Sequence, residues 1–271
     1  MTSDRPDLQS AFGSLAPLRE RPVPPQAEAL ALKRGYRAHP LDPTSAAGAE
    51  ALVDIRSFGL RGENFYASRR NPPHYAPIPG SVAGLWVREG VAERLAGVDR
   101  RLGEEGLGLW LFDAWRPDRV QAYFHDVWMP AELRRRRPGL DEDRLRAEVS
   151  SYWSAPTTDR ASPAPHLTGG AVDLSICWVD TAERLWMGSI FDDVSAIAHV
   201  DHFERNRSGD RLALSDDEAR SNRRLLYWLM VEAGFCSNPT EWWHYSHGDQ
   251  MWARLTGAEA ALYGAAAAPT R

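Results

Sequence analysis

The chain has 271 residues, of which 43% are hydrophobic and 25% are charged. This composition is that of an ordinary globular protein, and it excludes disordered, collagen-like and coiled-coil proteins. The formal net charge of −5 at pH 7 gives no general attraction to nucleic acids or anionic lipids. The length suits one catalytic-sized domain with a sizeable core.

The two ends of the chain differ in composition from residues 29–257, which form the predicted domain. Residues 1–28 mix prolines with small and charged side chains, so we expect an extended, poorly packed arm. Residues 258–271 are rich in alanine, and we expect a peripheral tail. No apolar stretch follows Met1, and no apolar run is long enough to span a bilayer. We therefore expect neither export nor membrane insertion, and the predicted location is the cytoplasm.

Cysteine and lysine are both rare in this sequence. The two cysteines, Cys177 and Cys236, form no C-x-x-C pair, so a disulfide framework or a redox motif is not expected. Lys33 is the one lysine, and almost all of the positive charge comes from arginine. We interpret that preference as a genomic bias without functional meaning.

In the first half of the domain, apolar residues at helical spacing predict a helix over 89–102. The short apolar run over 107–115 predicts a buried strand. Pro117 is typical of the first position of a helix, and a second helix is expected to follow it. Arg116 is therefore predicted to lie at a strand-to-helix turn.

Three further elements are predicted in the second half. Alternation over 171–176 indicates a strand that presents Asp173 on the face opposite its apolar residues. The capping box over 215–218 predicts the start of a helix that Gly234 ends. Residues 240–246 are dense in tryptophan and tyrosine, which favours a strand.

Two segments together supply two imidazoles and two carboxylates. His166 and Asp173 flank a glycine pair that allows a tight chain reversal, and Glu241 precedes His244 by three positions. A catalytic zinc ion typically takes three protein ligands and needs a nearby base. On an ideal strand Glu241 and His244 would face apart, so their convergence requires a bulge or twist at the two tryptophans between them.

Each motif alone also has a structural interpretation. An isolated histidine is more often structural than a ligand, Asp173 could cap or form an ion pair, and a tryptophan pair is more often part of a core. The hypothesis of a zinc site therefore rests on the occurrence of these motifs together. The remaining histidines lack such partners and are expected to be structural, with His199 and His202 as the first exceptions to consider. These histidines are His39, His74, His125, His199, His202 and His247.

Three motifs resemble the D-alanyl-D-alanine dipeptidases, including those of vancomycin resistance. They are H-x-x-G-x-A-x-D over 166–173, E-W-W-H over 241–244 and D-x-W-R-P over 113–117. Shorter segments agree, and the resemblance covers about residues 30–255. It implies a zinc metallopeptidase with an α+β fold: a single compact domain with a small, largely antiparallel central sheet flanked by helices. D,D-carboxypeptidases and the hedgehog signalling domain share this fold.

The resemblance also implies roles for individual residues. His166, Asp173 and His244 would be the ligands of one Zn2+ per chain, Glu241 the general base, and Arg116 the group that stabilises the tetrahedral intermediate. A zinc ion lowers the pKa of bound water, so a carboxylate of modest basicity suffices as the base. A guanidinium is always charged and suits a developing oxyanion, although a helix-start ion pair is the alternative for Arg116.

Two further carboxylates, Asp113 and Asp192, are expected in the site, and Ala164 departs from the family's pattern. Asp113 is expected to orient Arg116 or a histidine ligand, with an ordinary turn-stabilising contact as the alternative. Asp192 falls where the family's partner for the substrate ammonium would lie. Ala164 stands where the resistance dipeptidases have serine, so a contact to the substrate's carboxylate end is either missing or supplied elsewhere.

We therefore expect a dipeptidase for D-Ala-D-Ala or a closely similar small dipeptide. The rivals are a D,D-carboxypeptidase, an amidase of specialised metabolism and a non-catalytic, zinc-stabilised binding domain. The arginine run over 134–137 could suggest nucleic acid, but the acidic balance and the lack of interleaved aromatic residues favour a solvated helix or loop. The expected partner is the small dipeptide, without nucleic acid or membrane, and the oligomeric state stays open.

Overall fold

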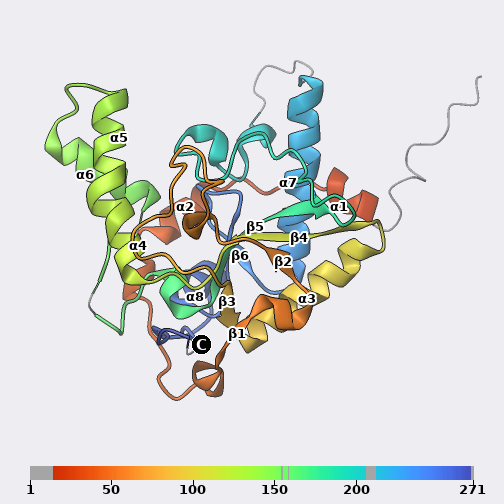
Figure 1. The fold of residues 1–271 in the computed structure, drawn as a ribbon, viewed down its shortest axis with the longest axis horizontal. Coiled ribbons are helices and arrows are strands. Elements are labelled where there is room, and N and C mark those ends of the chain that lie inside the picture. Colours follow the sequence, from red (N-terminus) through yellow and green to blue (C-terminus); the bar gives the residue numbers. More distant parts are fainter. Residues whose placement is uncertain (1–14, 154, 158, 206–211, 270–271) are drawn as a thin grey trace, which may run out of the picture.

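The computed structural model describes residues 15–153, 155–157, 159–205 and 212–269 (Figure 1). Its centre is a five-stranded sheet in the order β2-β4-β5-β7-β6, in which β2 and β4 are parallel and the other neighbours are antiparallel. A separate antiparallel pair joins β1 to β3. The strands are β1 (Leu52–Asp54), β2 (Arg61–Gly62), β3 (Trp86–Arg88), β4 (Leu107–Asp113), β5 (Ala171–Trp178), β6 (Cys236–Ser237) and β7 (His244–Ser246).

Helices surround this sheet, so the predicted α+β class with a small, largely antiparallel sheet is confirmed. The α-helices are α1 (Ala16–Glu20), α2 (Ala27–Lys33), α3 (Glu89–Gly103), α4 (Asp118–Ala122), α5 (Met129–Arg136), α6 (Glu142–Tyr152), α7 (Leu214–Glu232) and α8 (Gln250–Thr256). α3 packs against β4, and α7 packs against α1, β5 and β6. Within the described ranges, no helix combines the length and the apolar character needed to cross a bilayer.

The predicted helix over 89–102 is α3, and the apolar residues that predicted it, Val91, Leu95, Val98 and Leu102, are buried. The strand predicted over 107–115 is β4, which ends two residues earlier, at Asp113. The helix expected after Pro117 begins as α4 and continues through a π-helical segment, Tyr123–Trp128, into α5. Arg116 therefore lies between a strand and a helix, as predicted.

The helix predicted from the capping box is α7, but the capping box itself is wrong. The helix begins at Leu214 after Ala213, and no side chain caps its first turn. Ser215 lies inside that turn, where its hydroxyl no longer occupies the N-cap position. The acidic residues Asp216 and Asp217 still lie at the positive end of the helix dipole.

The strand predicted over 240–246 is shorter than expected. Only His244–Ser246 forms β7, and Glu241 lies in the turn that precedes it. Asn238 accounts for the difference, because its side-chain Oδ1 accepts hydrogen bonds from both the amide and the hydroxyl of Thr240. Such asparagine contacts to the local backbone favour a turn over an extended strand.

The predictions of a poorly packed arm and a peripheral tail are wrong where the structure describes them. Leu15, Leu18 and Val23 are buried, and α1 packs against α7. Ala261 and Tyr263 are also buried, and Ala261 pairs with Leu41. Apolar side chains within a proline-rich or alanine-rich segment are enough to attach it to the core. Residues 1–14 and 270–271 lie outside the described residues.

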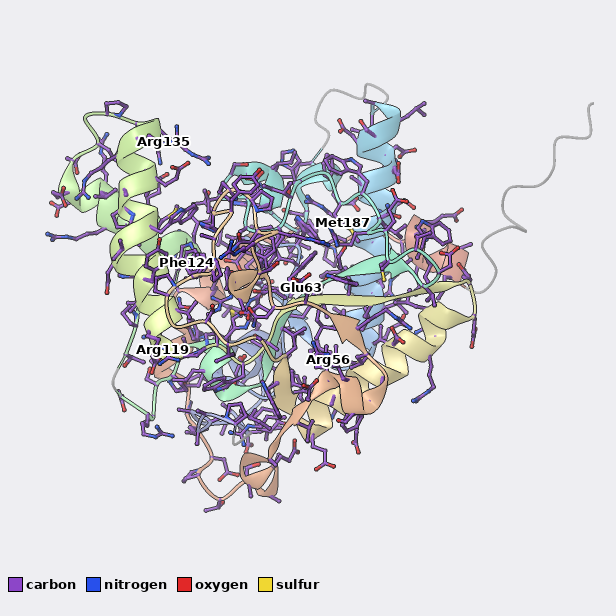
Figure 2. The ribbon with its side chains drawn as sticks, viewed as in Figure 1. Arg56, Glu63, Arg119, Phe124, Arg135 and Met187 are labelled. Atoms are coloured by element: carbon purple, nitrogen blue, oxygen red, sulfur yellow. The ribbon has the colours of Figure 1, made fainter. Side chains whose placement is uncertain are left out.

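The arginine run follows the expectation of a solvated helix. Helices α5 and α6 project from the body of the molecule (Figure 1), and Arg135 lies near the outer end of α5 (Figure 2). The four arginines 134–137 pair with Glu142, Glu132 and Glu148 on the same two helices. The run is thus balanced by local carboxylates.

Candidate active site

Three neighbouring strands place three polar side chains in one row across the sheet. Asp113 on β4 is paired with Asp173 on β5, and Asp173 is paired with His244 on β7. The β4–β5 register shifts between Leu111 and Asp113, which is the signature of a β-bulge. The extra residue turns Asp113 toward the face that carries Asp173.

A short 3-10 turn, Pro165–Thr168, places His166 beside this row. Gly169 ends the turn with φ of 74°, a conformation that glycine adopts without steric cost. The Nδ1 atom of His166 lies 2.8 Å from the carbonyl oxygen of Ala114. Because a carbonyl oxygen only accepts, Nδ1 carries a proton, and Nε2 is the ring nitrogen that faces the row.

The side chains of His166, Asp173 and His244 converge on one point. Their ligand atoms all lie within 4.8 Å of one another, and all three residues are buried. His166 Nε2 and His244 Nδ1 are 3.1 Å apart. Asp173 Oδ1 lies 3.3 and 3.1 Å from these two nitrogens, but without the alignment of a hydrogen bond.

This cluster fits a metal ion. Two ring nitrogens and a carboxylate oxygen are electron-pair donors, and packed together in a buried site they repel one another unless a cation lies between them. His244 Nε2 lies 3.2 Å from the Ser246 hydroxyl, so Nδ1 is the atom that faces the cluster. Within the part of the chain that the structure describes, no other group of histidine, cysteine, aspartate and glutamate has this geometry.

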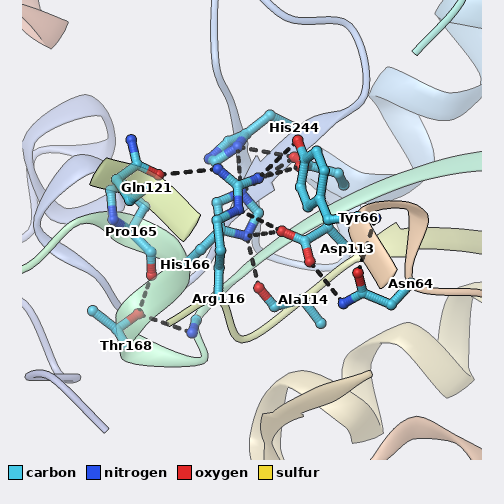
Figure 3. Close-up of polar contacts among 12 residues, drawn as sticks. Asn64, Tyr66, Asp113, Ala114, Arg116, Gln121, Pro165, His166, Thr168 and His244 are labelled. Carbon is cyan, nitrogen blue, oxygen red and sulfur yellow. Dashed lines mark hydrogen bonds and ion pairs between the residues drawn. The ribbon is translucent and has the colours of Figure 1, made fainter. Parts of the chain in front are cut away.

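Arg116 lies against the same cluster (Figure 3). Its Nε donates to Asp113 Oδ2 at 2.7 Å, and its Nη2 donates to Asp173 Oδ2 at 3.0 Å. Burial disfavours the charged guanidinium, but the two carboxylates outweigh it and raise the pKa of Arg116 above its ordinary value. The side chain therefore carries a permanent, oriented positive charge.

Asp113 makes both of the contacts that the sequence suggested. Besides the hydrogen bond from Arg116, its Oδ2 lies 3.6 Å from His166 Nδ1. Its other oxygen, Oδ1, accepts from the side-chain amide of Asn64 at 3.1 Å. Because every polar edge of Asp113 has a partner, the carboxylate is held rigidly under Arg116.

Glu241 faces the cluster from the turn before β7. Its Oε2 lies 3.7 Å from His244 Nδ1, and its side chain is 14% exposed. The turn is closed by hydrogen bonds from the Glu241 amide to the Asn238 carbonyl and from the His244 amide to the Glu241 carbonyl. The convergence that an ideal strand forbids is thus achieved by a turn.

Asp192 lies on the loop after β5. It has a left-handed backbone with φ of 63°, and its Oδ1 accepts a hydrogen bond from the Tyr66 hydroxyl at 3.1 Å. Its Oδ2 is buried without a hydrogen-bond partner. Burial raises the pKa of Asp192 well above its ordinary range. A cationic group that bound here would give Oδ2 a partner and would favour the ionised carboxylate.

Helix α7 holds the loop that carries Asp192. The guanidinium of Arg223 is buried and donates to the carbonyl oxygens of Met187, Ile197 and His199. The three bonds tie both ends of the loop to one rigid side chain. The positions of the Asp192 carboxylate and of the helix are therefore linked.

A cavity of about 560 Å3 opens over these residues. Arg116, His166, Asp173, Asp192, Glu241 and His244 all line it. A cavity of this size accommodates a small ligand, and the convergence of a few charged groups in it is typical of an active site. His199 also lines the cavity, but it is not part of the three-residue cluster.

Sequence reasoning missed three side chains of the site. Tyr66 joins Arg116 to Asp192, because its hydroxyl accepts from Arg116 Nη2 at 3.3 Å and donates to Asp192. Gln121 accepts from Arg116 Nη1 at 3.0 Å, and the ring of Trp153 lies 5.2 Å from the guanidinium carbon. A sequence signal was available only for Tyr66, which directly follows Asn64–Phe65, one of the shorter segments that agree with the D-alanyl-D-alanine dipeptidases.

A protein-family model described as D-ala-D-ala dipeptidase, peptidase family M15, matches residues 59–258. The chain belongs to this family. Curated relatives named D-alanyl-D-alanine dipeptidase include a Synechocystis protein, 32% identical over 196 residues, which are 67% of this chain and 78% of that protein. The Streptomyces coelicolor protein is 30% identical over 204 residues, 73% of this chain and 91% of its own length.

A third relative, from Enterococcus faecalis, is 31% identical over 202 residues, again 73% of this chain and 91% of that protein. A solved structure described as VanYB in complex with D-Alanine-D-Alanine aligns with 69% of this chain and 90% of that chain. Its sequence identity is 15% and its TM-score is 0.38. The family model and the curated relatives confirm the predicted family and the class of enzyme, a peptidase.

Proposed function

We propose that the chain is a zinc-dependent dipeptidase that hydrolyses D-alanyl-D-alanine, or a closely related small dipeptide, to free amino acids. The observation that carries this proposal is the buried cluster of His166, Asp173 and His244, with Glu241 and Arg116 beside it in one cavity. The family and the names of the relatives support the substrate class. The cytoplasmic location stays a prediction from the sequence.

His166, Asp173 and His244 would hold the zinc ion, since two imidazole nitrogens and one carboxylate oxygen are donors that zinc accepts. When bound, zinc supplies a Lewis acid that lowers the pKa of water and polarises a carbonyl oxygen. Three protein ligands leave a coordination position open, which is the arrangement of catalytic sites and not of structural ones. This favours an enzyme over a zinc-stabilised binding domain.

Glu241 would act as the general base. Its carboxylate lies beside the cluster in a partly buried turn, within reach of a water molecule directed at the amide carbon. After taking the proton from that water, the same carboxyl group can pass it to the nitrogen of the leaving amino acid. A single group thus accounts for both proton transfers.

Arg116 would stabilise the oxyanion that forms at the amide carbon. Asp113, Gln121 and Asp173 fix the orientation of its guanidinium, so little reorganisation is needed when charge develops. Asp192 would bind the ammonium group of the dipeptide through its unpartnered Oδ2. An anion fixed at the amino end favours a free dipeptide over an N-acylated one.

The test is a panel of substrates with the zinc-loaded enzyme and its Glu241→Gln variant. We expect cleavage of D-Ala-D-Ala, no cleavage of N-acetyl-D-Ala-D-Ala, and a loss of turnover of about 100-fold or more in the variant, which should still bind one zinc ion. Faster cleavage of a longer stem peptide would favour a D,D-carboxypeptidase. Unchanged turnover in the variant would remove Glu241 from the mechanism.

A further inference from the structure

The one lysine of the chain lies in the wall of the active-site cavity. Lys33 is the last residue of α2, and the other side chains of the sequence that carry a permanent positive charge are all arginines. Its segment precedes the first residue of the family match, residue 59. The part of the chain matched by the family model therefore does not include this part of the wall.

Lys33 is held in a defined place beside the proposed general base. Its Nζ donates to Thr240 Oγ1 at 2.9 Å, and Thr240 immediately precedes Glu241. The Thr240 hydroxyl in turn donates to Asn238 Oδ1 at 3.1 Å, which leaves its oxygen to accept from the ammonium group. The direction of these bonds orients the positive charge at the cavity wall.

The segment that follows Lys33 is tied to the rest of the fold. The side-chain amide of Gln250, at the start of α8, donates to the carbonyl oxygens of Arg37 and His39. Ser162, from the loop before His166, donates to the same Arg37 carbonyl. The cationic wall is therefore positioned by the elements that also carry the site.

The positive and the negative side chains of the cavity wall come from different segments of the chain. Apart from Arg116, the arginine and lysine residues that line the cavity are Lys33, Arg34 and Arg37, from residues 33–37, whereas Asp192 and Asp193 come from the loop after β5. Glu241 interacts electrostatically with both Lys33 and Asp192. A ligand with an anionic end and a cationic end matches this distribution.

The burial of Lys33 also favours an anionic group of a ligand beside it. It lowers the pKa of Lys33 even though Glu241 acts in the opposite direction. A partly buried ammonium whose desolvation is incompletely offset gains from the arrival of a second anion.

We propose that Lys33 binds the terminal carboxylate of the dipeptide and so makes the enzyme specific for substrates with a free carboxyl end. This inference rests on the proposed dipeptidase function. With Asp192 binding the ammonium group and Lys33 binding the carboxylate, the enzyme would select substrates whose two charged ends lie as far apart as those of a dipeptide. A longer or amidated peptide would then bind less tightly.

The test compares D-Ala-D-Ala with D-Ala-D-alaninamide, which lacks the carboxylate, using the zinc-loaded full chain. The native enzyme should prefer the dipeptide. Lys33→Gln should raise the KM for the dipeptide by about 10- to 100-fold with little change in kcat, and should leave kcat/KM for the amide nearly unchanged. Lys33→Arg should retain most of the preference, because the charge is kept.

Controls separate the alternatives. Arg56→Met removes an exposed positive charge outside the cavity and should leave the preference intact. Figure 2 shows Arg56 away from α5 and α6. Lys33→Met repeats the measurement without a hydrogen-bonding side chain. Its zinc content and melting temperature should equal those of the native protein, which shows that the fold is kept.

Several results would overturn the assignment. Equal losses for the dipeptide and the amide would mean that Lys33 acts on Glu241 through Thr240 and not on the substrate. A native enzyme without preference, or a Lys33→Gln variant that keeps the preference, would exclude a carboxylate contact. If the native enzyme cleaves neither compound, the dipeptidase proposal itself fails.

Discussion

At the scale of single residues, Tyr66 is the side chain that joins the two ends of the site. Its ring lies 4.8 Å from the guanidinium carbon of Arg116, and its hydroxyl bonds to both Arg116 and Asp192. Removing the hydroxyl leaves the ring in place but deprives two charged groups of a partner. Such hydrogen bonds contribute more than neutral ones.

We therefore expect Tyr66→Phe to lower kcat/KM for D-Ala-D-Ala by about 10-fold, with bound zinc unchanged. Steady-state kinetics and metal analysis check this prediction. Tyr75→Phe is the matched control, because Tyr75 is 70% exposed and should tolerate the change. If Tyr66→Phe retains native kinetics, the link between Arg116 and Asp192 has no role in catalysis.

The sequence predicted the central residues because each belongs to a local motif with a chemical meaning. His166, Asp173, Glu241 and His244 are spaced in a way that suits a metal and a base. Tyr66 carries no such motif, and its bond to Asp192 spans 126 positions in the chain. Contacts of that kind arise from the packing of the whole fold, which spacing along the sequence does not reveal.

At the scale of elements, the segment before β7 shows how a turn signal in the sequence outweighed a strand signal. The density of aromatic residues over 240–246 favours a strand, but the Asn238-Pro239 pair is a turn signal that precedes it. The structure follows the turn signal up to Trp243 and the strand signal from His244 onward. That division is what allows Glu241 and His244 to face the same cluster.

The glycine pair between His166 and Asp173 has a second structural role. A Cβ atom added at Gly170 would lie 2.5 Å from the carbonyl oxygen of His247, a backbone atom that cannot move aside alone. Gly170→Ala should therefore lower the free energy of unfolding by about 2 kcal/mol or more. Gly103→Ala, at the end of α3 with open space around it, should change it by less than about 1 kcal/mol. Urea unfolding of both variants checks the contrast, and equal effects would contradict it.

Helix α5 contains a carboxylate whose ionisation stabilises the fold. Hydrogen bonds from Arg135 and Arg136 lower the pKa of Glu132 to about 2. Because the folded pKa lies below the unfolded value of about 4.3, the stabilisation is complete above the unfolded pKa. It is lost as the pH falls from there toward the folded pKa.

Glu132→Gln should therefore lower the free energy of unfolding by about 0.5–1 kcal/mol at neutral pH, and the deficit should shrink between about pH 5 and pH 3. Chemical denaturation across this range measures it. Glu142→Gln is the control, because Glu142 is 60% exposed and makes a single ion pair. A deficit for Glu132→Gln that is independent of pH would mean that the ion pairs contribute nothing.

At the scale of the whole molecule, composition predicted the fold class but misjudged the ends of the chain. Proline content indicates an extended backbone and says little about whether the neighbouring side chains are buried. In the segment predicted as an arm, the carbonyl oxygen of Arg21 accepts a hydrogen bond from the Trp228 indole. The Arg21 guanidinium also stacks on that ring, 3.3 Å from its centroid. The ends thus contribute to the core, and α2 contributes Lys33 to the cavity.

The proposed ligands come from three parts of the chain, so bound metal should stabilise the whole fold. His166 lies in the turn before β5, Asp173 on β5 and His244 on β7. An ion that binds only the folded state at a thousand times its Kd adds about 4 kcal/mol, which for a domain of this size raises Tm by roughly 10 °C. Calorimetry of the zinc-loaded and chelator-treated protein measures this difference. His166→Ala should show no dependence of Tm on zinc, because a ligand is removed, and a native Tm that chelation does not change would contradict metal binding at this cluster.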